Sequence, residues 1–235
     1  MLRFETAGES HGECLVATLM GLPAGIPVSL DFVNRELWRR QQGYGRGGRM
    51  KIERDAAEVT AGVRHGLTLG GPIALQVRNR DYANWEERMN PWPVAVETAE
   101  VHLPRPGHAD LVGTQKYKHS DVRNILERAS ARETAARVAG GALCKAFLRA
   151  LGVEVYSHVV QIASVRAPEA AAALTLADFA EVDSSPVRCL DADATRAMVR
   201  EIDDLRHHDR QERVRRNVER HTQEKIAAAL VQLAT

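Results

Sequence analysis

The chain has 235 residues, and its 32 Lys and Arg residues against 31 Asp and Glu residues leave a formal net charge of +1. This balance excludes a polycationic nucleic-acid coat and an acidic tail protein. Hydrophobic residues make up 44% of the chain, which is typical of a globular protein and too many for a disordered one. The sequence contains no membrane-spanning apolar run and no signal peptide, so we expect a soluble, cytoplasmic protein without a membrane partner.

The three cysteines, Cys14, Cys144 and Cys189, stand far apart and form no C-x-x-C pair. Such sparse usage predicts reduced, buried thiols in a reducing compartment. Because the chain also lacks a His-rich metal spacing, no metal site is expected.

Short apolar runs separated by glycines predict strands at residues 2–4 and 14–20. Asp31 is expected to cap a helix from residue 32 to about 41. A strand pair is then predicted at residues 59–63 and 72–77.

Residues 79–119 form a long, charged, irregular stretch, and a loop of this length is usually functional when it is ordered. The apolar spacing after it predicts one long helix from residue 120 or 121 to about 151. Gly140 and Gly141 lower its helix propensity, so we expect them to admit a neighbouring backbone. A long alternating strand at 153–165 and a helix at 192–205 follow.

Residues 8–12 (GESHG) match the letters of a G-x-S-x-G nucleophile elbow. Too few residues precede them to supply the sheet that an elbow needs, so a serine hydrolase is excluded. Two interpretations stay open: an ordinary hairpin turn, or a turn that presents Ser10 and an exposed His11 to a ligand.

Residues 39–51 carry five cations and no acid, and they include a G-x-G-x-x-G pattern at 43–48. The pattern follows a helix rather than a strand, so a dinucleotide-binding fold is rejected. Glycine backbone and arginine side chains can bind phosphate or carboxylate, and the alternative is a solvated basic loop. A nucleic-acid-binding module is rejected because the basic runs lack interleaved stacking aromatics apart from Tyr44.

Two further segments carry candidate chemistry. Prolines and Gly107 in residues 104–110 would hold His108 at a fixed angle, with Asp110 close enough in sequence to orient it, although a loop histidine is also common as plain polar surface. Residues 128–134 (RASARET) could let a flat ligand lie against a helix. The alternative is a helix-packing site in which Arg132 and Glu133 face solvent.

Together these four segments occur in the order found in chorismate synthase, and the chain resembles that family over about residues 1–205. The resemblance implies an α/β fold with helices between two antiparallel sheets, and a homotetramer. It also implies a carbon–oxygen lyase of the shikimate pathway and of aromatic amino acid biosynthesis. This enzyme converts 5-enolpyruvylshikimate 3-phosphate to chorismate and phosphate by an anti-1,4-elimination that requires reduced FMN.

The resemblance also implies roles for individual residues. His11 and His108 would be the two acid–base groups, and Arg40, Arg46 and Arg49 would hold the phosphate and carboxylates of the substrate. Positions matching Arg40 and Arg46 often carry NADPH contacts in the family, with NADPH as a flavin reductant. The FMN-contacting stretch is matched by Arg128, Ala129 and Ser130.

The sequence departs from the family after residue 205. Family members are much longer, and residues 206–235 form an arginine-rich tail without a family match, with six arginines and three acids between residues 206 and 220. We therefore expect a family portion at 1–205, a helical tail at 206–235, and a truncated chain. The alternative function is a catalytically impaired fragment that binds anionic metabolites or a partner subunit.

Overall fold

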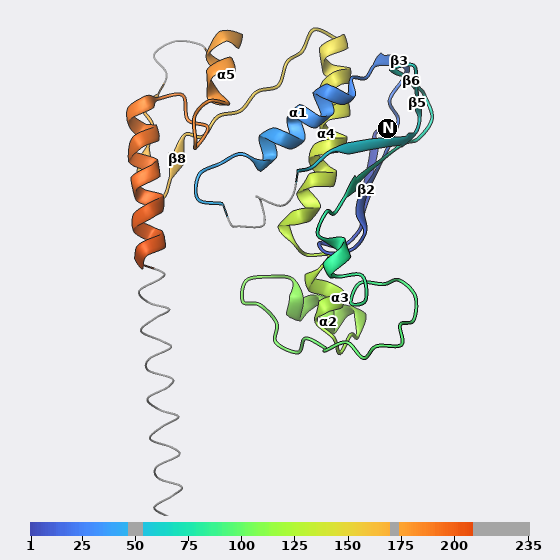
Figure 1. Cartoon of the computed structure of the whole chain (residues 1–235). Coiled ribbons are helices and arrows are strands. Elements are labelled where there is room, and N and C mark those ends of the chain that lie inside the picture. Colours follow the sequence, from blue (N-terminus) through green and yellow to red (C-terminus); the bar gives the residue numbers. More distant parts are fainter. Residues whose placement is uncertain (47–53, 170–173, 209–235) are drawn as a thin grey trace, which may run out of the picture. The chain divides into compact units, whose positions relative to one another are not determined.

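The structure, a computed structural model, describes residues 1–46, 54–169 and 174–208 (Figure 1). The described residues fall into two compact units. The first holds residues 1–42 and 54–155, and the second holds residues 43–46, 156–169 and 174–208. The expected boundary at residue 205 stays a prediction, because most of the tail lies outside the described residues.

A four-stranded antiparallel sheet forms the framework of the first unit, in the order β1 (Arg3–Ala7), β2 (Cys14–Met20), β7 (Ile73–Arg78) and β4 (Ala57–Ala61). Alternate residues of β2 and β7 are buried, so one face of the sheet supplies the core. The predicted strands at 2–4, 14–20 and 72–77 are confirmed, and so is the predicted pairing of the strand near 59 with the strand near 75.

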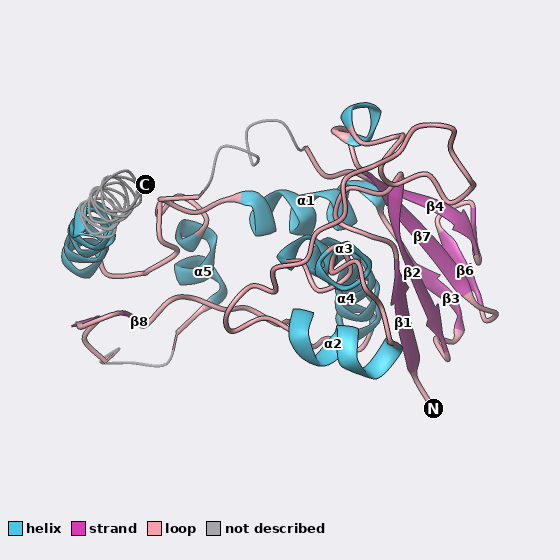
Figure 2. Ribbon diagram, turned by 90° about the horizontal axis from the view of Figure 1, so that it is seen from below, coloured by secondary structure: helices cyan, strands magenta, loops and turns pink. Residues whose placement is uncertain are grey.

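Helices α1 (Leu30–Gln41) and α4 (Thr134–Ala150) lie on one face of this sheet (Figure 2). Small buried alanines on α4 allow a close approach, and the core contains Leu15, Leu19, Val33, Leu37, Ile73, Leu75, Ala139 and Leu143. The predicted first helix is confirmed, but its cap is Ser29 rather than Asp31. The Ser29 Oγ accepts a hydrogen bond from the Phe32 backbone N–H, whereas Asp31 lies within the first turn.

A smaller sheet of β3 (Ala24–Pro27), β6 (Leu67–Leu69) and β5 (Val63–Arg64) completes the strands of the first unit. The strand expected at 59–63 is divided between β4 and β5 at Gly62. This residue has φ +83°, and a Cβ there would lie 2.4 Å from the Pro72 carbonyl oxygen. Only glycine fits this bend.

The single long helix expected at 120–151 is wrong. The segment instead contains α3 (Arg123–Leu126), the 3-10 turn η3 (Ala131–Glu133) and α4. Ser130 breaks the helix because its backbone is extended (ψ 148°) and its Oγ accepts from the Arg132 N–H. Gly140 also differs from expectation, since its close neighbour is the ring of Phe4 and not a backbone.

The irregular stretch 79–119 contains the short turn η2 (Tyr82–Asn84) and the helix α2 (Asp110–Tyr117). Helices α2 and α3 pack together at Gly113, where a Cβ would lie 2.4 Å from Cγ2 of Ile125. This glycine lets the two short helices pack closely against each other.

The second unit is built around Met198, Val187 and Cys189. It contains a small hairpin of β8 (Gln161–Ile162) and β9 (Val165–Arg166), the helix α5 (Leu176–Val182), and a helix over residues 192–208 that confirms the predicted one. The long strand expected at 153–165 is wrong, because the chain turns at Ala163 (φ 47°) after a two-residue ladder. Across the described ranges, no helix has the length and apolarity needed to cross a membrane.

Candidate functional site

His11 lies in the glycine-flanked turn between β1 and β2. Its backbone N–H donates to Oε2 of Glu127 at 3.1 Å, and its ring Nδ1 lies 2.8 Å from the same oxygen. The ring stacks on Trp85 with the two centroids 3.9 Å apart. Ser10 is only 2% exposed and the His11 side chain is 20% exposed, so His11 is partly buried and not exposed as expected. Glu127 and Trp85 cover it.

His108 is exposed on the loop before α2, after Gly107 with φ +73°, and its Nδ1 lies 3.1 Å from the Pro106 carbonyl oxygen. Asp110 was expected to orient His108, but its buried carboxylate accepts from Arg105 instead, from Nε at 2.8 Å and Nη2 at 2.9 Å. These hydrogen bonds lower the pKa of Asp110 to about 2. Arg105 and Asp110 therefore fix the loop that carries His108.

The two histidine loops are attached to the same short helix. Arg105, which precedes His108, also donates to the Leu126 carbonyl oxygen at 3.3 Å. The next residue, Glu127, holds His11. The end of α3 thus brings together two motifs that are almost 100 residues apart in sequence.

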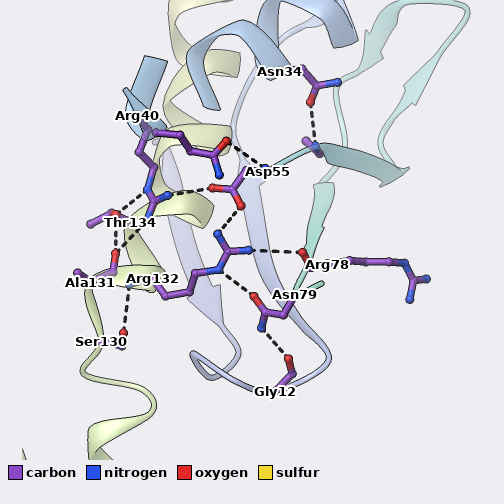
Figure 3. A network of polar contacts seen from close by, with 12 residues as sticks. Gly12, Asn34, Arg40, Asp55, Arg78, Asn79, Ser130, Ala131, Arg132 and Thr134 are labelled. Carbon is purple, nitrogen blue, oxygen red and sulfur yellow. Dashed lines mark hydrogen bonds and ion pairs between the residues drawn. The ribbon is translucent and has the colours of Figure 1, made fainter. Parts of the chain in front are cut away.

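Arg132 is the centre of a buried polar network, shown in Figure 3. It donates to Asp55 and to the side-chain oxygen of Asn79, the latter at 2.8 Å. Asn79 in turn donates to the Gly12 carbonyl oxygen at 2.6 Å, directly after His11. The solvent-facing position considered for Arg132 is wrong, because Arg132 is 6% exposed and paired with a buried carboxylate.

Arg40 joins this network from the end of α1. It donates to the second oxygen of Asp55 at 2.9 Å, to Oγ1 of Thr134 at 2.8 Å and to the Ala131 carbonyl oxygen at 3.2 Å (Figure 3). Asp55 thus holds two guanidinium groups, and arginine is a side chain suited to binding phosphate or carboxylate.

The other two arginines of the basic loop are placed differently. Arg46 belongs to the second unit and is exposed. In that unit the loop is held by Tyr44, whose hydroxyl donates to Asp203 at 2.8 Å, and this contact raises the pKa of Tyr44. Arg49 lies outside the described residues. Within the first unit, Arg40 is the arginine of this loop that the structure describes in the network of Figure 3.

The stretch 128–130 forms the turn between α3 and η3. Arg128 donates to the backbone oxygen and the hydroxyl of Thr6, both at 2.7 Å, so it ties this turn to β1. Ser130 is the cap of η3. Arg128 and Ala129 also border an open, mainly apolar cavity of about 530 Å³, together with Ala109, Val112, Lys116 and Tyr117.

The cavity has the features needed to hold a planar, anionic cofactor such as FMN. Its lining is mostly apolar, which suits a flat ring, and Lys116 supplies a positive charge at its border, whereas the Arg128 guanidinium is bonded to Thr6. Among residues 1–46, 54–169 and 174–208, no group of three or more His, Cys, Asp or Glu side chains could hold a metal ion.

Sequence reasoning missed the buried carboxylates. The sequence motifs include neither Glu127 nor Asp55, and they place Asn79 and Trp85 only within the irregular stretch 79–119. Glu127 stands between Leu126 and Arg128 at the end of α3, and this local sequence does not mark it as buried. Nothing in the sequence identified His11, 116 residues away, as its partner.

Comparison with known proteins places the chain among homologues. A family model described as chorismate synthase matches residues 2–211. A chorismate synthase from Solibacter usitatus is 57% identical over 209 residues, which cover 87% of this chain and 53% of the relative. One from Thermobifida fusca is 54% identical over 214 residues, covering 88% of this chain and 54% of the relative.

A solved structure described as a chorismate synthase crystal structure is similar as well. The TM-score is 0.68 at 40% sequence identity, and the match covers 88% of this chain and 54% of the other. The expected α/β fold class is thereby confirmed. The chain spans about half the length of the curated relatives it matches.

Proposed function

Because the chain belongs to the chorismate synthase family, we propose that it acts as a lyase that converts 5-enolpyruvylshikimate 3-phosphate to chorismate and phosphate. The reaction is the anti-1,4-elimination implied by the resemblance. The observation that carries the proposal is the set of contacts through which Asn79, Arg132 and Asp55 join the His11 turn to Arg40. A proton-transfer group and two arginines are thereby joined by one hydrogen-bonded network.

In this proposal His11 and His108 move protons. An imidazole suits this role because its ordinary pKa is close to neutral pH, so it can both accept and donate a proton. The attachment of both loops to Leu126 and Glu127 at the end of α3 supports a common site.

Arg40, Arg46 and Arg49 hold the phosphate and carboxylates of the substrate. Arg40 keeps a fixed direction because Asp55 and Thr134 hold its guanidinium. A fixed guanidinium loses less conformational entropy when an anion binds than a mobile one does.

We assign FMN to the cavity beside Arg128 and Ala129, with Ser130 in the same turn. Reduced FMN supplies electron density that assists the departure of phosphate. NADPH as the flavin reductant, with contacts at Arg40 and Arg46, a homotetrameric assembly and a cytoplasmic location belong to the same proposal.

A second candidate follows from the chain spanning about half the length of its relatives. In this case the chain binds anionic metabolites or a partner subunit without turnover. Arg40 and its network support anion binding in either case.

The experiment is anaerobic turnover with chemically reduced FMN, followed by the appearance of chorismate and phosphate in equal amounts. We expect formation of both, and a fall of roughly 10²–10⁴-fold in His11→Ala and in His108→Ala, the usual contribution of a positioned acid or base. Substrate binding without product formation, measured by calorimetry, would favour the second candidate and contradict the lyase.

A further inference from the structure

We propose that Glu127 is a positioning residue for His11, holding the neutral imidazole as the tautomer that carries its proton on Nδ1. This inference rests on the proposed role of His11 as an acid–base group. Glu127 itself needs no contact with the substrate to act in this way.

The first step is the geometry of the contact. One carboxylate oxygen, Oε2, accepts the His11 backbone N–H at 3.1 Å and lies 2.8 Å from the ring Nδ1. The Glu127 carbonyl oxygen also accepts the Ser10 N–H at 3.0 Å. Three contacts from one residue therefore fix both the backbone and the ring of the turn.

The second step is the position of the proton. An ionised carboxylate can only accept hydrogen bonds, so the proton between Oε2 and Nδ1 belongs to the ring. The Arg123 guanidinium lies 3.5 Å from the other oxygen of Glu127 and pairs the carboxylate with a cation. The lone pair of the neutral ring then lies on Nε2, and proton transfer passes through that atom.

The third step is the orientation of the ring plane. Trp85 stacks on His11 with an angle of 27° between the planes. The indole is itself fixed, because its Nε1–H donates to Asp81 at 3.0 Å. Glu127 sets the direction of Nδ1, and Trp85 sets the plane in which Nε2 lies.

Burial gives this arrangement its strength. Glu127 is 2% exposed, and a charge-assisted hydrogen bond in such surroundings is stronger than one between neutral groups in water. Its other oxygen, Oε1, has no hydrogen-bond partner within the described residues, and Arg123 is its ion-pair contact. The hydrogen-bond contacts of the Glu127 side chain are therefore both with His11.

The test reads the tautomer directly, by long-range ¹H–¹⁵N NMR of the chain labelled at histidine, at a pH where the ring is neutral. The His11 signals are assigned by their loss in His11→Gln. We expect the wild-type ring to carry its proton on Nδ1. A wild-type ring protonated on Nε2 would overturn the proposal, and this measurement needs neither turnover nor a second variant.

The variant Glu127→Gln removes the charge and keeps the shape. We expect the His11 ring to shift towards the Nε2-protonated tautomer, which water favours. An unchanged tautomer would mean that an amide oxygen accepts the Nδ1 proton equally well, so the negative charge of Glu127 would play no part in fixing the tautomer. The matched control is Glu36→Gln, because Glu36 is another largely buried carboxylate with two cationic partners, Arg39 and Lys145. It should leave the His11 signals in place.

The catalytic consequence is measured separately. In Glu127→Gln, kcat should fall by less than the roughly 10²–10⁴-fold expected for removing the imidazole, with KM nearly unchanged. If the tautomer shifts while kcat stays unchanged, Glu127 does not contribute to the reaction, and the proposed lyase function still stands. If wild-type chain gives no chorismate, the proposed function fails, while the wild-type tautomer still decides the positioning of His11.

Discussion

Three buried carboxylates, those of Asp55, Asp110 and Glu127, each hold a cationic or imidazole side chain of the candidate site. A carboxylate away from water must be paired, because an isolated buried charge is costly. The side chains paired with them are consequently fixed by folding and not by the arrival of a ligand.

The pair of Arg105 and Asp110 makes a prediction about pH. Hydrogen bonds from Arg105 hold the pKa of Asp110 at about 2, below its ordinary 3.8. A lowered folded-state pKa stabilises the protein above the unfolded-state value, and this contribution is lost as the pH falls from about 3.8 towards about 2. Asp110→Asn should therefore lower the free energy of unfolding at pH 7 by about 1–2 kcal/mol, a range that allows for solvent screening of half-exposed Arg105.

Urea unfolding of wild type and Asp110→Asn, compared at neutral pH and near pH 2, checks this expectation. The difference between the two proteins should shrink at the acidic end. Asp31→Asn is the control, because Asp31 is exposed in the first turn of α1, and its effect should stay within about 0.5 kcal/mol. A difference for Asp110→Asn that persists at acidic pH would point to lost packing instead of lost charge.

The exposed arginine of the basic loop gives a prediction about binding. Arg46→Ala should weaken binding of the phosphorylated substrate by roughly 1.5–3 kcal/mol, the range for a hydrogen bond to a charged group. Arg46→Lys should recover only part of this loss, since lysine keeps the charge but lacks the planar fork. Calorimetric titration measures both variants. Equal affinity of Arg46→Lys and wild type would mean that Arg46 contributes only its charge.

At the scale of elements, replacing each of two adjacent glycines of α4 by alanine should change the free energy of unfolding in opposite directions. A Cβ on Gly140 would lie 2.2 Å from the Phe4 ring, whereas a Cβ on Gly141 meets nothing within 4 Å. Gly141→Ala should stabilise the chain by about 1 kcal/mol through helix propensity. Gly140→Ala should destabilise it by about 1–3 kcal/mol, because the ring must leave its place against α4.

Thermal unfolding of both variants measures this difference. The double variant with Phe4→Ala should recover part of the loss caused by Gly140→Ala, since the obstructing ring is then absent. Stabilisation by Gly140→Ala alone would show that the Phe4 ring moves aside without cost.

The local sequence pattern is enough to predict a strand when its buried and exposed residues alternate regularly. The strand at 14–20 is an example, because alternate residues of β2 face the core. The predicted strand at 153–165 has a similar apolar pattern but pairs over only two residues. A strand needs a partner in the right register, and the sequence of one strand does not contain that partner.

The candidate site divides in the same way. Glycine, histidine and arginine motifs indicate His11, Arg40 and His108 as candidates, because loop chemistry is visible in short segments. The pairing of Arg132 with Asp55, 77 residues apart, was not visible. It depends on η3 and the segment before β4 meeting in three dimensions, so the acids that orient the site emerge only from the fold.

For the molecule as a whole, the open shape of the cavity proposed for FMN should limit how tightly these 235 residues bind the flavin. Its described walls come from α2, α3 and the turn after α3. Large planar ligands bind tightly when they are enclosed on most sides. Relatives of about twice the length have further residues with which to enclose the ligand.

We therefore expect this chain to bind FMN much more weakly than a relative of full family length, while it keeps part of its affinity for phosphorylated anions through Arg40. Exposed apolar side chains beside the cavity, among them Leu111, Val112 and Tyr117, should also promote self-association. Flavin fluorescence titration beside light scattering measures both properties, and Val112→Asp should reduce the association because it places a charge on that surface. Arg128→Ala, compared in the same titration, shows whether the remaining flavin affinity depends on this cavity. Tight, stoichiometric FMN binding by a monodisperse wild-type protein would mean that these 235 residues enclose the flavin without further walls.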